Sequence, residues 1–478
     1  MKKTITAILA HIVVIIVLIC CIGAFTSTGV QEGASKFTGE IERGAVLRIL
    51  ENDTAVKQGY LGELISGFNE KYKEYGVKAV DANMDQYTDL ANDGPYGYGP
   101  DVLYQANDVL MKYVENRHIL PLPVDELDCY DKIGEKAWGA YTREILGQDF
   151  TFGVPVNPQG PLLYYRKDML PENWEQDWDD DKNGVCDIVE YWTDMYRYSK
   201  IMKDGNFKTS KGDKMYGYMR SFLEPYFSVG YLYSYGGYTF GENNTNPKDI
   251  GHSKGNAEKG AWIARQLASQ MDERCIDDSV TVTAYAALAT GEYFATITTP
   301  DVYTMFVDEM KARGYTDEYI AENLVTADIP KLPVSGDLTD ESQGFFDSKM
   351  MGGIQGYAIS SYTKYPNACL AFIDYATSYE KINRRNELLG IVPARKDVAQ
   401  SVGGLSEIIN QNLEKGDIVV MPSISEVAQI WTPLQTFFQD LAKDPFRTNG
   451  YKYNSLEAIK LALEKVDTQI YQAIFTLA

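Results

Sequence analysis

Histidine is scarce in this chain, with three residues among 478. His118 and His252 are the two that lie beyond the N-terminal segment, and neither falls in an H-E-x-x-H, zinc-finger or G-x-S-x-G setting. Histidine is the usual general base beside a nucleophile and the commonest metal ligand. The scarcity therefore argues against histidine-based nucleophilic catalysis and against a histidine-rich metal site.

Cysteine is also sparse, with six residues and no C-x-x-C pair. Zinc ribbons and thioredoxin-like redox motifs need closely spaced cysteines, so neither is expected here. Beyond the N-terminal segment the spacing is wide and leaves two possibilities open, a disulfide or buried free thiols. The four residues concerned are Cys129, Cys186, Cys275 and Cys369.

Positive charge is in deficit, because 45 basic side chains face 67 acidic ones and give a formal net charge of −22 at pH 7. Non-specific binding of nucleic acid requires a basic surface, so we expect no nucleic-acid partner. An excess of acidic side chains instead keeps a surface protein soluble.

The apolar run at the N-terminus is too short for a comfortable transmembrane helix. Lys2 and Lys3 precede Ala7–Ile19, a run of about 13 residues that only His11 interrupts. A positively charged start followed by an apolar core of this length is typical of a secretory signal peptide. We therefore expect the rest of the chain to lie outside the cytoplasm.

The end of this run, Leu18-Ile19-Cys20-Cys21, resembles the lipobox of bacterial lipoproteins, in which cleavage precedes a lipid-modified cysteine. The resemblance implies a lipoprotein signal peptide at 1–20, a lipid on Cys21 and anchoring at the extracellular face of the bacterial cell membrane. Lipidation of Cys20 and a simple membrane anchor are the alternatives. Residues 21–44 are rich in Gly, Ser, Thr and charge with little periodicity, which predicts a flexible tether.

Strand and helix patterns alternate after the tether. Val46–Leu50 is expected to be a strand, and apolar residues recur at helical spacing from Leu61 to Tyr72. Such alternation predicts α/β layers, in which ligands bind at the C-terminal ends of strands. In the second half we expect strands at Tyr293–Thr298 and Gly356–Ser360 and helices at 188–202, 256–271, 300–313, 366–376, 425–443 and 455–475.

Glu224-Pro225-Tyr226-Phe227 combines a carboxylate with two aromatic rings. A sugar presents a rim of hydroxyls and flat faces of aliphatic C–H groups, so a sugar site needs a polar acceptor and an aromatic plate. This tetrapeptide offers both, and Tyr303 and Trp431 could supply further plates. The structural alternative is a buried turn with two core aromatic residues.

Short motifs follow one another in an order typical of one family. Together they resemble the bacterial maltose/maltodextrin-binding proteins, which are extracellular solute-binding proteins of ABC importers, over nearly all of residues 45–478. The motifs are Gly99-Pro100-Asp101, Asn107-Asp108, Tyr164-Tyr165-Arg166-Lys167-Asp168, Glu224-Pro225-Tyr226-Phe227, Gly236-Gly237-Tyr238, Met421-Pro422 and Trp431.

The resemblance implies a two-lobed periplasmic-binding-protein-like α/β fold with discontinuous lobes and a central ligand cleft. It implies capture of a maltodextrin-type oligosaccharide by lobe closure and delivery to the permease subunits of an ABC importer; we expect a monomer. The N-lobe would comprise 45–156 and 329–376, and the C-lobe 157–328 and 377–478. Crossings are then expected near Val156-Asn157, Asp328-Ile329-Pro330 and Tyr375–Ser378.

The resemblance also assigns ligand contacts, because carboxylates and amides accept hydrogen bonds from hydroxyls and flat rings cover sugar faces. The residues expected to contact the sugar are Asp108, Asn157, Glu224, Tyr226, Phe227, Tyr303 and Trp431.

Several positions depart from the family pattern. Gln105 stands in place of an aromatic plate, Val109 and Gln435 in place of arginines, and Asp301 in place of a tryptophan. Tyr303, two residues after Asp301, would take over that tryptophan's role. The contacts around two sugar subsites are therefore expected to differ, which leaves the length and linkage of the glucan open.

A second feature is independent of this family. Asp179–Glu190 satisfies D-x-[DN]-x-[DN]-G-x5-E, the calcium loop of EF-hands, with Gly184 at the sharp turn. No second such loop is visible, so we predict a structural Ca²⁺ rather than a calcium sensor; an acidic helix start without an ion is the alternative. The predicted ligands are Asp179, Asp181, Asn183, the carbonyl of Val185, Asp187 and Glu190.

Acids beside aromatic rings also line the clefts of glycoside hydrolases, so hydrolysis is the competing function. A hydrolase needs two carboxylates about 5–10 Å apart across one bond. The resemblance places Asp108 and Glu224 on opposite lobes as binding acids, and we therefore expect no catalytic residues. A receptor for another oligosaccharide, or one that serves a sensor kinase, is the remaining alternative.

Overall fold

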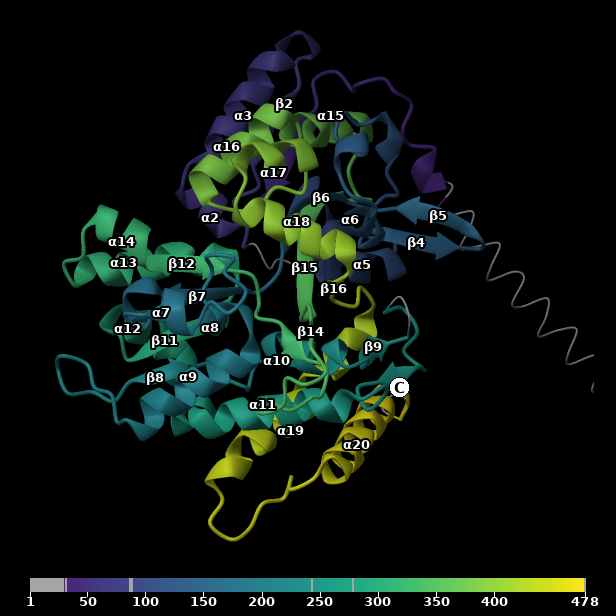
Figure 1. Cartoon of the computed structure of the whole chain (residues 1–478). Coiled ribbons are helices and arrows are strands. Elements are labelled where there is room, and N and C mark those ends of the chain that lie inside the picture. Colours follow the sequence, from purple (N-terminus) through teal and green to yellow (C-terminus); the bar gives the residue numbers. More distant parts are fainter. Residues whose placement is uncertain (1–29, 31, 86–88, 242–243, 277–278, 477–478) are drawn as a thin grey trace, which may run out of the picture. The chain divides into compact units, whose positions relative to one another are not determined.

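The computed structural model describes residues 30, 32–85, 89–241, 244–276 and 279–476, and the chain divides into two compact units (Figure 1). The first unit contains the described residues up to Asn157, together with Ile354–Leu389 and Pro393–Ser401. The second contains Pro158–Gly353, Gly390–Val392 and the described residues from Val402 onward. Each unit is therefore assembled from separate pieces of the chain.

The first unit is built on a sheet in which β1 (Val46–Leu50) pairs in parallel with β2 (Lys78–Asp81) and β3 (Val102–Ala106). On its other side β3 pairs antiparallel with β15 (Met350–Ile359). Ile49 is fully buried in this sheet, and the strand expected at Val46–Leu50 is confirmed. Since β1 and β3 are parallel, their C-terminal ends meet at one edge, where the loops that follow can hold a ligand.

Helices α3 (Tyr60–Lys71), α15 (Pro366–Ala376) and α16 (Tyr379–Leu389) pack against one another in the first unit (Figure 1). Apolar residues at helical spacing turn Phe68 inward, where its ring lies 5.1 Å from that of Phe372 in an edge-on arrangement. The other elements of the first unit are α2 (Asp53–Lys57), α4 (Leu90–Asp93), α5 (Asn107–Glu115), α6 (Glu135–Gly139), β4 (Thr142–Ile145), β5 (Gln148–Thr151), β6 (Val154–Gln159) and α17 (Lys396–Val402), of which β6 and α17 run past its boundary.

A buried ion pair joins the end of β1 to α16. Arg385 donates to both carboxylate oxygens of Glu51, over 2.6 and 2.9 Å, and to the Tyr357 hydroxyl over 2.9 Å. Arg385 is 1 % exposed and Glu51 2 % exposed. Removing one partner of such a pair leaves an uncompensated charge in the core, so both ends depend on each other.

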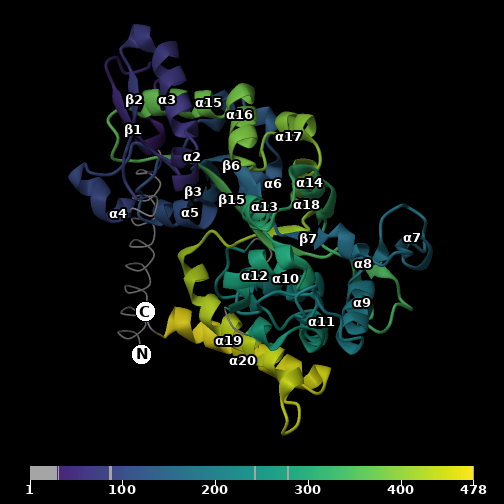
Figure 2. The same cartoon turned by 90° about the vertical axis from the view of Figure 1, so that its left-hand side faces the viewer.

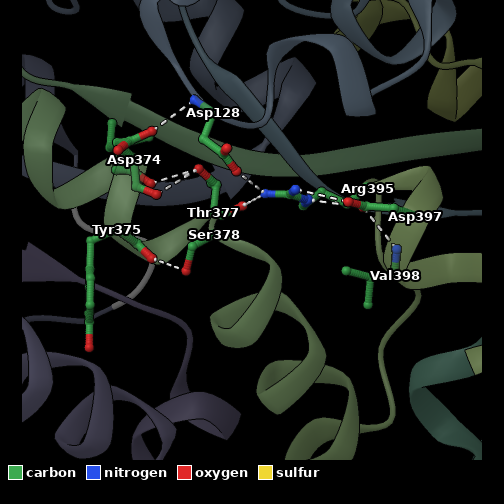
Figure 3. A network of polar contacts seen from close by, with 9 residues as sticks. Asp128, Asp374, Tyr375, Thr377, Ser378, Arg395, Asp397 and Val398 are labelled. Carbon is green, nitrogen blue, oxygen red and sulfur yellow. Dashed lines mark hydrogen bonds and ion pairs between the residues drawn. The ribbon is translucent and has the colours of Figure 1, made fainter. Parts of the chain in front are cut away.

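A second arginine ties together the loops beside α15 and α17 (Figure 3). Arg395 donates to Asp128 over 2.8 Å, to the backbone carbonyl of Thr377 over 3.1 Å, and in a fork to both oxygens of Asp397 over 3.0 and 2.9 Å. Asp374 in turn accepts from the backbone N–H of Asp128 over 3.0 Å. These contacts hold residues 374–378 inside the first unit.

The segment before β1 differs from the expected tether. The backbone N–H groups of Thr38 and Gly39 donate to the side chain of Asn367 over 2.9 and 3.0 Å, and Glu42 accepts from Asn367 and Ala368. The flexible tether predicted for 21–44 is therefore wrong for 38–42, which are bound to the start of α15. The predicted signal peptide at 1–20 and Cys21 lie outside the described residues. Among the helices that are described, none has the length and apolar character needed to cross a membrane.

The second unit contains a four-stranded sheet. In it β7 (Leu162–Arg166) pairs antiparallel with β11 (Tyr293–Thr298) and with β12 (Leu324–Ala327), and β8 (Tyr216–Tyr218) pairs in parallel with β11. All residues of β11 are buried, and the strand expected at Tyr293–Thr298 is confirmed. The second unit also contains shorter strands outside this sheet, which are β9 (Tyr238–Phe240), β10 (Ile250–Gly251), β13 (Leu332–Pro333), β14 (Phe345–Phe346) and β16 (Ile418–Val420).

In the second unit α11 (Ala257–Gln270) packs against α10 (Pro225–Ser234), α19 (Trp431–Lys443) and α20 (Leu456–Phe475) (Figure 2). The helices expected at 256–271 and 455–475 are confirmed, whereas the one expected at 188–202 is interrupted at Tyr191, which forms a β-bridge with Lys331. The other helices are α7 (Trp174–Asp177), α8 (Asp187–Glu190), α9 (Trp192–Asp204), α12 (Ser279–Thr290), α13 (Tyr303–Ala312), α14 (Asp317–Asn323) and α18 (Leu405–Lys415).

Two boundaries between the units differ from those expected. Residues 329–353 group with the second unit, because the Lys331 carbonyl accepts from Trp192 and the Pro333 carbonyl from Tyr235. Residues 377–389 group with the first unit, where Arg385 is held by Glu51. The crossings expected at Asp328-Ile329-Pro330 and Tyr375–Ser378 are thus corrected to Gly353/Ile354 and Leu389/Gly390, and the chain returns to the first unit once more for Pro393–Ser401. Both boundaries are decided by long-range contacts, which local sequence patterns do not reveal.

The four cysteines in the described part of the chain are buried free thiols, which decides between the two possibilities left by their spacing: Cys129, Cys186, Cys275 and Cys369. Burial raises the pKa of the Cys129 thiol to about 11 and that of Cys186 to about 12. Both thiols therefore act as small apolar core groups rather than as nucleophiles.

Candidate functional site

Glu224 stands directly before the first turn of α10 in the second unit. Its backbone is extended, with φ −98° and ψ 98°, and Pro225 follows as the first residue of the helix. Proline favours this position because its fixed φ suits a helix and its missing N–H is not needed there. The side chain of Glu224 is 35 % exposed, so its carboxylate sits at a helix start, where negative charge is favoured, and can still reach a ligand.

Arg220, four residues earlier, pairs with this carboxylate through Nη2 and Oε2. Its guanidinium also covers the ring of Phe227, with 3.6 Å between the guanidinium carbon and the ring centroid. Burial lowers the pKa of Arg220, and the charge of Glu224 opposes this shift. Sequence reasoning missed Arg220, which precedes the turn at 222–223 and lies outside the helix.

Tyr226 and Phe227 both lie in the first turn of α10, with ring centroids 5.1 Å apart and an angle of 80° between the planes. Both side chains are half-buried. Since the Arg220 guanidinium covers one face of Phe227, that face cannot stack on a sugar.

Tyr303 begins α13, and its ring centroid lies 6.4 Å from that of Tyr164 on β7. Asp301 lies two residues earlier in the short turn that precedes α13. Burial raises the pKa of Tyr285, the charge of Arg220 opposes this shift, and the charges of Asp301 and Glu224 add to it. Tyr285 is therefore near enough to Asp301 and to Glu224 for both charges to affect it, which nothing in the sequence pattern of α12 indicated.

Trp431 is the first residue of α19 and is half-buried. α19 packs against α10, the helix that begins next to Glu224. The apolar face of α19 is formed by residues that follow at helical spacing, among them the buried Leu434 and Phe438. The structure thus places the expected second-unit residues at the starts of α10, α13 and α19.

Asp108 and Asn157 belong to the first unit. Asp108 lies in the first turn of α5, which follows β3 directly. Burial raises the pKa of Asp108, and hydrogen bonds from backbone N–H groups partly offset this shift. Asn157 lies in β6 and is 3 % exposed, beside the hydroxyl of the buried Tyr104. Asp108 stands just after the end of β3, where α/β sheets usually bind ligands, whereas Asn157 lies within β6.

The loop from Asp179 to Glu190 folds around its own acidic side chains in the second unit. Asp179 accepts from the backbone N–H groups of Asn183 and Gly184 over 3.1 and 3.2 Å. Gly184 has φ +83°, in the left-handed region that glycine favours. Asp187 accepts from the N–H of Asp180 over 2.9 Å, so the loop closes on itself.

Three of the expected metal ligands converge. Carboxylate oxygens of Asp181, Asp187 and Glu190 all lie within 4.8 Å of one another. The Asn183 side chain donates to Asp181 over 3.1 Å and to Glu190 over 2.9 Å. The oxygens of the three carboxylates suit a hard cation such as Ca²⁺, whereas the Asn183 side-chain oxygen accepts from the Val185 N–H over 2.7 Å.

A buried aspartate–histidine–threonine chain occurs elsewhere in the second unit. His252 Nδ1 lies 3.0 Å from Asp467, and its Nε2 lies 3.3 Å from the Thr239 hydroxyl. The order resembles that of a nucleophile relay. Because Thr239 and His252 are both 0 % exposed, a substrate cannot reach the hydroxyl, and the three residues serve to join α20 to β9 and β10.

Two discontinuous α/β units, with acidic and aromatic side chains at helix starts, define a two-lobed solute-binding protein, and the fold class expected from the sequence is confirmed. The chain belongs to the bacterial extracellular solute-binding protein family, whose model matches residues 63–411. It is similar to the maltose-binding periplasmic protein MalE of Listeria monocytogenes, solved with maltose, at a TM-score of 0.68 and 21 % identity, covering 90 % of this chain and 98 % of that one.

Two relatives in Bacillus subtilis (strain 168) are similar over most of the chain. The maltodextrin-binding protein MdxE is 25 % identical over 405 residues, which cover 82 % of this chain and 84 % of the relative. A galactooligosaccharide-binding protein is 24 % identical over 394 residues, which cover 81 % of this chain and 82 % of the relative.

Proposed function

We propose that this protein is an extracellular receptor that binds maltodextrin-type oligosaccharides by closure of its two units and delivers them to an ABC importer. The observation that carries the proposal is the start of α10, where the Glu224 carboxylate stands beside Tyr226 and is charge-balanced by Arg220. A carboxylate oxygen suits a hydroxyl hydrogen bond and an aromatic ring suits a sugar face. Family membership and the similarity to MdxE support the importer and the ligand class.

The ligand contacts that we propose come from both units, Asp108 and Asn157 from the first and four residues from the second, which are Glu224, Tyr226, Tyr303 and Trp431. Ligands that touch both units favour the closed form through their higher affinity for it. With a few charge-assisted hydrogen bonds and one or two stacked rings, we expect a Kd on the order of micromolar, about −8 kcal/mol.

A thermal-shift screen tests the ligand class. We expect maltose, maltotriose and longer maltodextrins to raise the melting temperature, and isomaltose, xylo-oligosaccharides and cello-oligosaccharides to leave it unchanged, because a bound ligand stabilises only the folded state. Stabilisation by none of the maltodextrins would contradict the proposal.

Galacto-oligosaccharides are the second candidate ligands, because the galactooligosaccharide-binding relative matches the chain almost as well as MdxE does. Adding galactobiose and galactotriose to the same screen separates the candidates. A shift with these sugars and none with maltotriose would keep the receptor role and replace its ligand.

We further propose that the receptor is a monomer held at the membrane by a lipid on Cys21 and that it does not hydrolyse its ligand. Substituting Cys21→Ala should release the protein from the membrane fraction of producing cells into the medium. Retention of the variant in the membrane fraction would favour Cys20 or an uncleaved anchor as the attachment.

We also propose that the Asp179–Glu190 loop holds a structural Ca²⁺. Asp179, Asp181, Asn183, the Val185 carbonyl, Asp187 and Glu190 would hold the ion, whose charge would offset the repulsion between carboxylates that lie within 4.8 Å of one another. Extracellular Ca²⁺ at about millimolar level would fill even a weak site.

A further inference from the structure

Arg220 contacts two residues at the start of α10 in the second unit, Glu224 and Phe227. The residue is 8 % exposed, yet it carries a full charge. Its Nη2 pairs with Glu224, its flat face lies 3.6 Å from the centroid of Phe227, and within the described part of the chain its Nε–H has no hydrogen-bond partner. The guanidinium is therefore fixed from two sides, by one carboxylate and one ring.

The pairing with Arg220 also restricts the side-chain conformation of Glu224. A glutamate at a helix start has several rotatable bonds, and ordering them on ligand binding costs free energy. The pairing of Oε2 with Arg220 removes part of that freedom before any ligand arrives. The planar guanidinium directs its N–H groups in a fixed fork, which an ammonium group does not.

The geometry points to Arg220 as the positioning residue that holds Glu224 ready for a ligand hydroxyl at Oε1, with Phe227 as the support of Arg220 rather than as a sugar plate. This inference rests on the proposed oligosaccharide-binding function. It also defines a preference: because Arg220 balances the charge of Glu224, this part of the site suits an uncharged sugar rather than a uronate or an amino sugar.

Arg265 offers a matched control in the same unit. It donates to the buried Asp444 over 2.8 Å, and its guanidinium lies 5.1 Å from the ring of Trp262 and 4.9 Å from that of Tyr451. Arg265 thus has the same combination of acid and aromatic partners as Arg220, but none of its partners is a candidate ligand residue. An effect of generally disturbed folding should appear in both arginine variants.

The test is maltotriose titration calorimetry with thermal melting on Arg220→Lys, Arg265→Lys, Glu224→Ala and the double variant Arg220→Lys/Glu224→Ala. We expect Arg220→Lys to weaken maltotriose binding about tenfold, because the lysine keeps the charge but loses the fork and the flat contact with Phe227. Arg265→Lys should lower the melting temperature and leave the Kd within about twofold.

The double variant separates positioning from a merely structural role. If Arg220 acts through Glu224, the Arg220→Lys change in the Glu224→Ala background should alter the Kd by less than about threefold. An equal loss in both backgrounds, or an unchanged Kd in Arg220→Lys, would overturn the inference. If the unaltered protein bound no oligosaccharide at all, the proposed function would fail instead, so the two failures are distinguishable.

If Arg220→Lys does not fold, Phe227→Leu gives an independent measurement, since it removes the ring that supports the guanidinium and leaves Glu224 in place. We expect it to weaken maltotriose binding by about threefold to tenfold in the presence of Glu224 and by less than about twofold in its absence. The same loss in both backgrounds would show that Phe227 contacts the sugar itself and would overturn the supporting role.

Discussion

Two carboxylates at helix starts carry most of the proposed chemistry. Glu224 precedes the first turn of α10, and Asp108 lies within the first turn of α5. A helix start favours an ionised acid, whereas burial opposes ionisation, as the raised pKa of Asp108 reflects. The hydrogen bond that Asp108 is proposed to accept from a sugar hydroxyl should therefore weaken when the solution is acidified.

Substituting Asp108→Asn should weaken maltotriose binding by about tenfold at pH 7, because an ionised acceptor makes roughly twice as strong a hydrogen bond as a neutral one. Burial raises the pKa of Asp108, so its carboxylate becomes protonated at a higher pH than an exposed aspartate would. As the solution is acidified from pH 7, the difference in maltotriose affinity between Asp108→Asn and the unaltered protein should therefore begin to shrink before about pH 4 is reached. Calorimetry across the acidic range measures this; a constant ratio would contradict it.

The same substitution should have the opposite effect on stability. Because the folded-state pKa of Asp108 is raised, its ionisation opposes folding, and this penalty is present above the folded pKa and absent below the unfolded value of about 3.9. Asp108→Asn should therefore be at least as stable as the unaltered protein at pH 7, with the difference vanishing in acid. Urea unfolding of the two proteins at pH 7 and in acid measures the sign of this difference in stability.

Trp431→Ala should weaken maltotriose binding at least about tenfold, or 1.4 kcal/mol, without unfolding the protein. The loss is expected because a flat ring that covers a sugar face contributes apolar area at low entropic cost. Tyr471→Ala on α20, a tyrosine that is 48 % exposed, is the control and should leave the Kd unchanged. Unchanged affinity in Trp431→Ala would remove this residue from the site.

A buried ion pair between Glu51, at the end of β1, and Arg385, on α16, joins two elements that lie far apart in the chain. Replacing Arg385 with Met should destabilise the protein by about 3–5 kcal/mol, because Glu51 at the end of β1 would be left buried without its partner. Glu51→Gln combined with Arg385→Met should recover much of that loss, since neither charge then remains. Denaturant unfolding of the unaltered protein, of each single variant, Arg385→Met and Glu51→Gln, and of the double variant measures the cycle. Purely additive losses would show that the pair is not coupled.

A chelator should lower the melting temperature by several degrees, because the Asp179–Glu190 loop would lose the ion that balances its carboxylates. Glu190→Gln should lower the melting temperature in Ca²⁺ and abolish the response to chelator. Maltotriose affinity of the folded protein should change little in either case. Loss of sugar binding without loss of stability would contradict a structural role for the ion.

Local patterns predicted most single elements but not the contacts between distant ones. Helical spacing located α11 and α20, and apolar runs located β1 and β11, because these signals depend only on near neighbours. The binding of residues 38–42 to Asn367 depends on a residue more than 300 positions away, which no local pattern encodes. The same holds for the corrected boundaries between the units.

The candidate site was predictable to a similar extent. Glu224 and Tyr226 could be predicted as ligand contacts because a short motif holds them two residues apart, and the Asp179–Glu190 loop could be predicted as an ion site because its ligand spacing is fixed within one segment. Tyr285 was missed, since only the folded second unit brings α12 near Glu224 and Asp301. Residues that support a site from other elements are visible only after folding.

At the scale of the whole molecule, the protein should bind its ligand and release it unchanged. Two candidate acids, Asp108 and Glu224, come from different units, and both are proposed to accept hydrogen bonds rather than to transfer protons. A day's incubation of maltotriose with the protein, followed by chromatography, should therefore yield only maltotriose. The appearance of glucose and maltose would instead favour a hydrolase.

Titration calorimetry with maltotriose, using cellotriose as the matched control of different linkage, tests the central claim most directly. We predict saturable binding of one maltotriose per chain with a Kd on the order of micromolar, about −8 kcal/mol, and much weaker binding of cellotriose. The absence of heat with maltotriose and with every longer maltodextrin would contradict the claim.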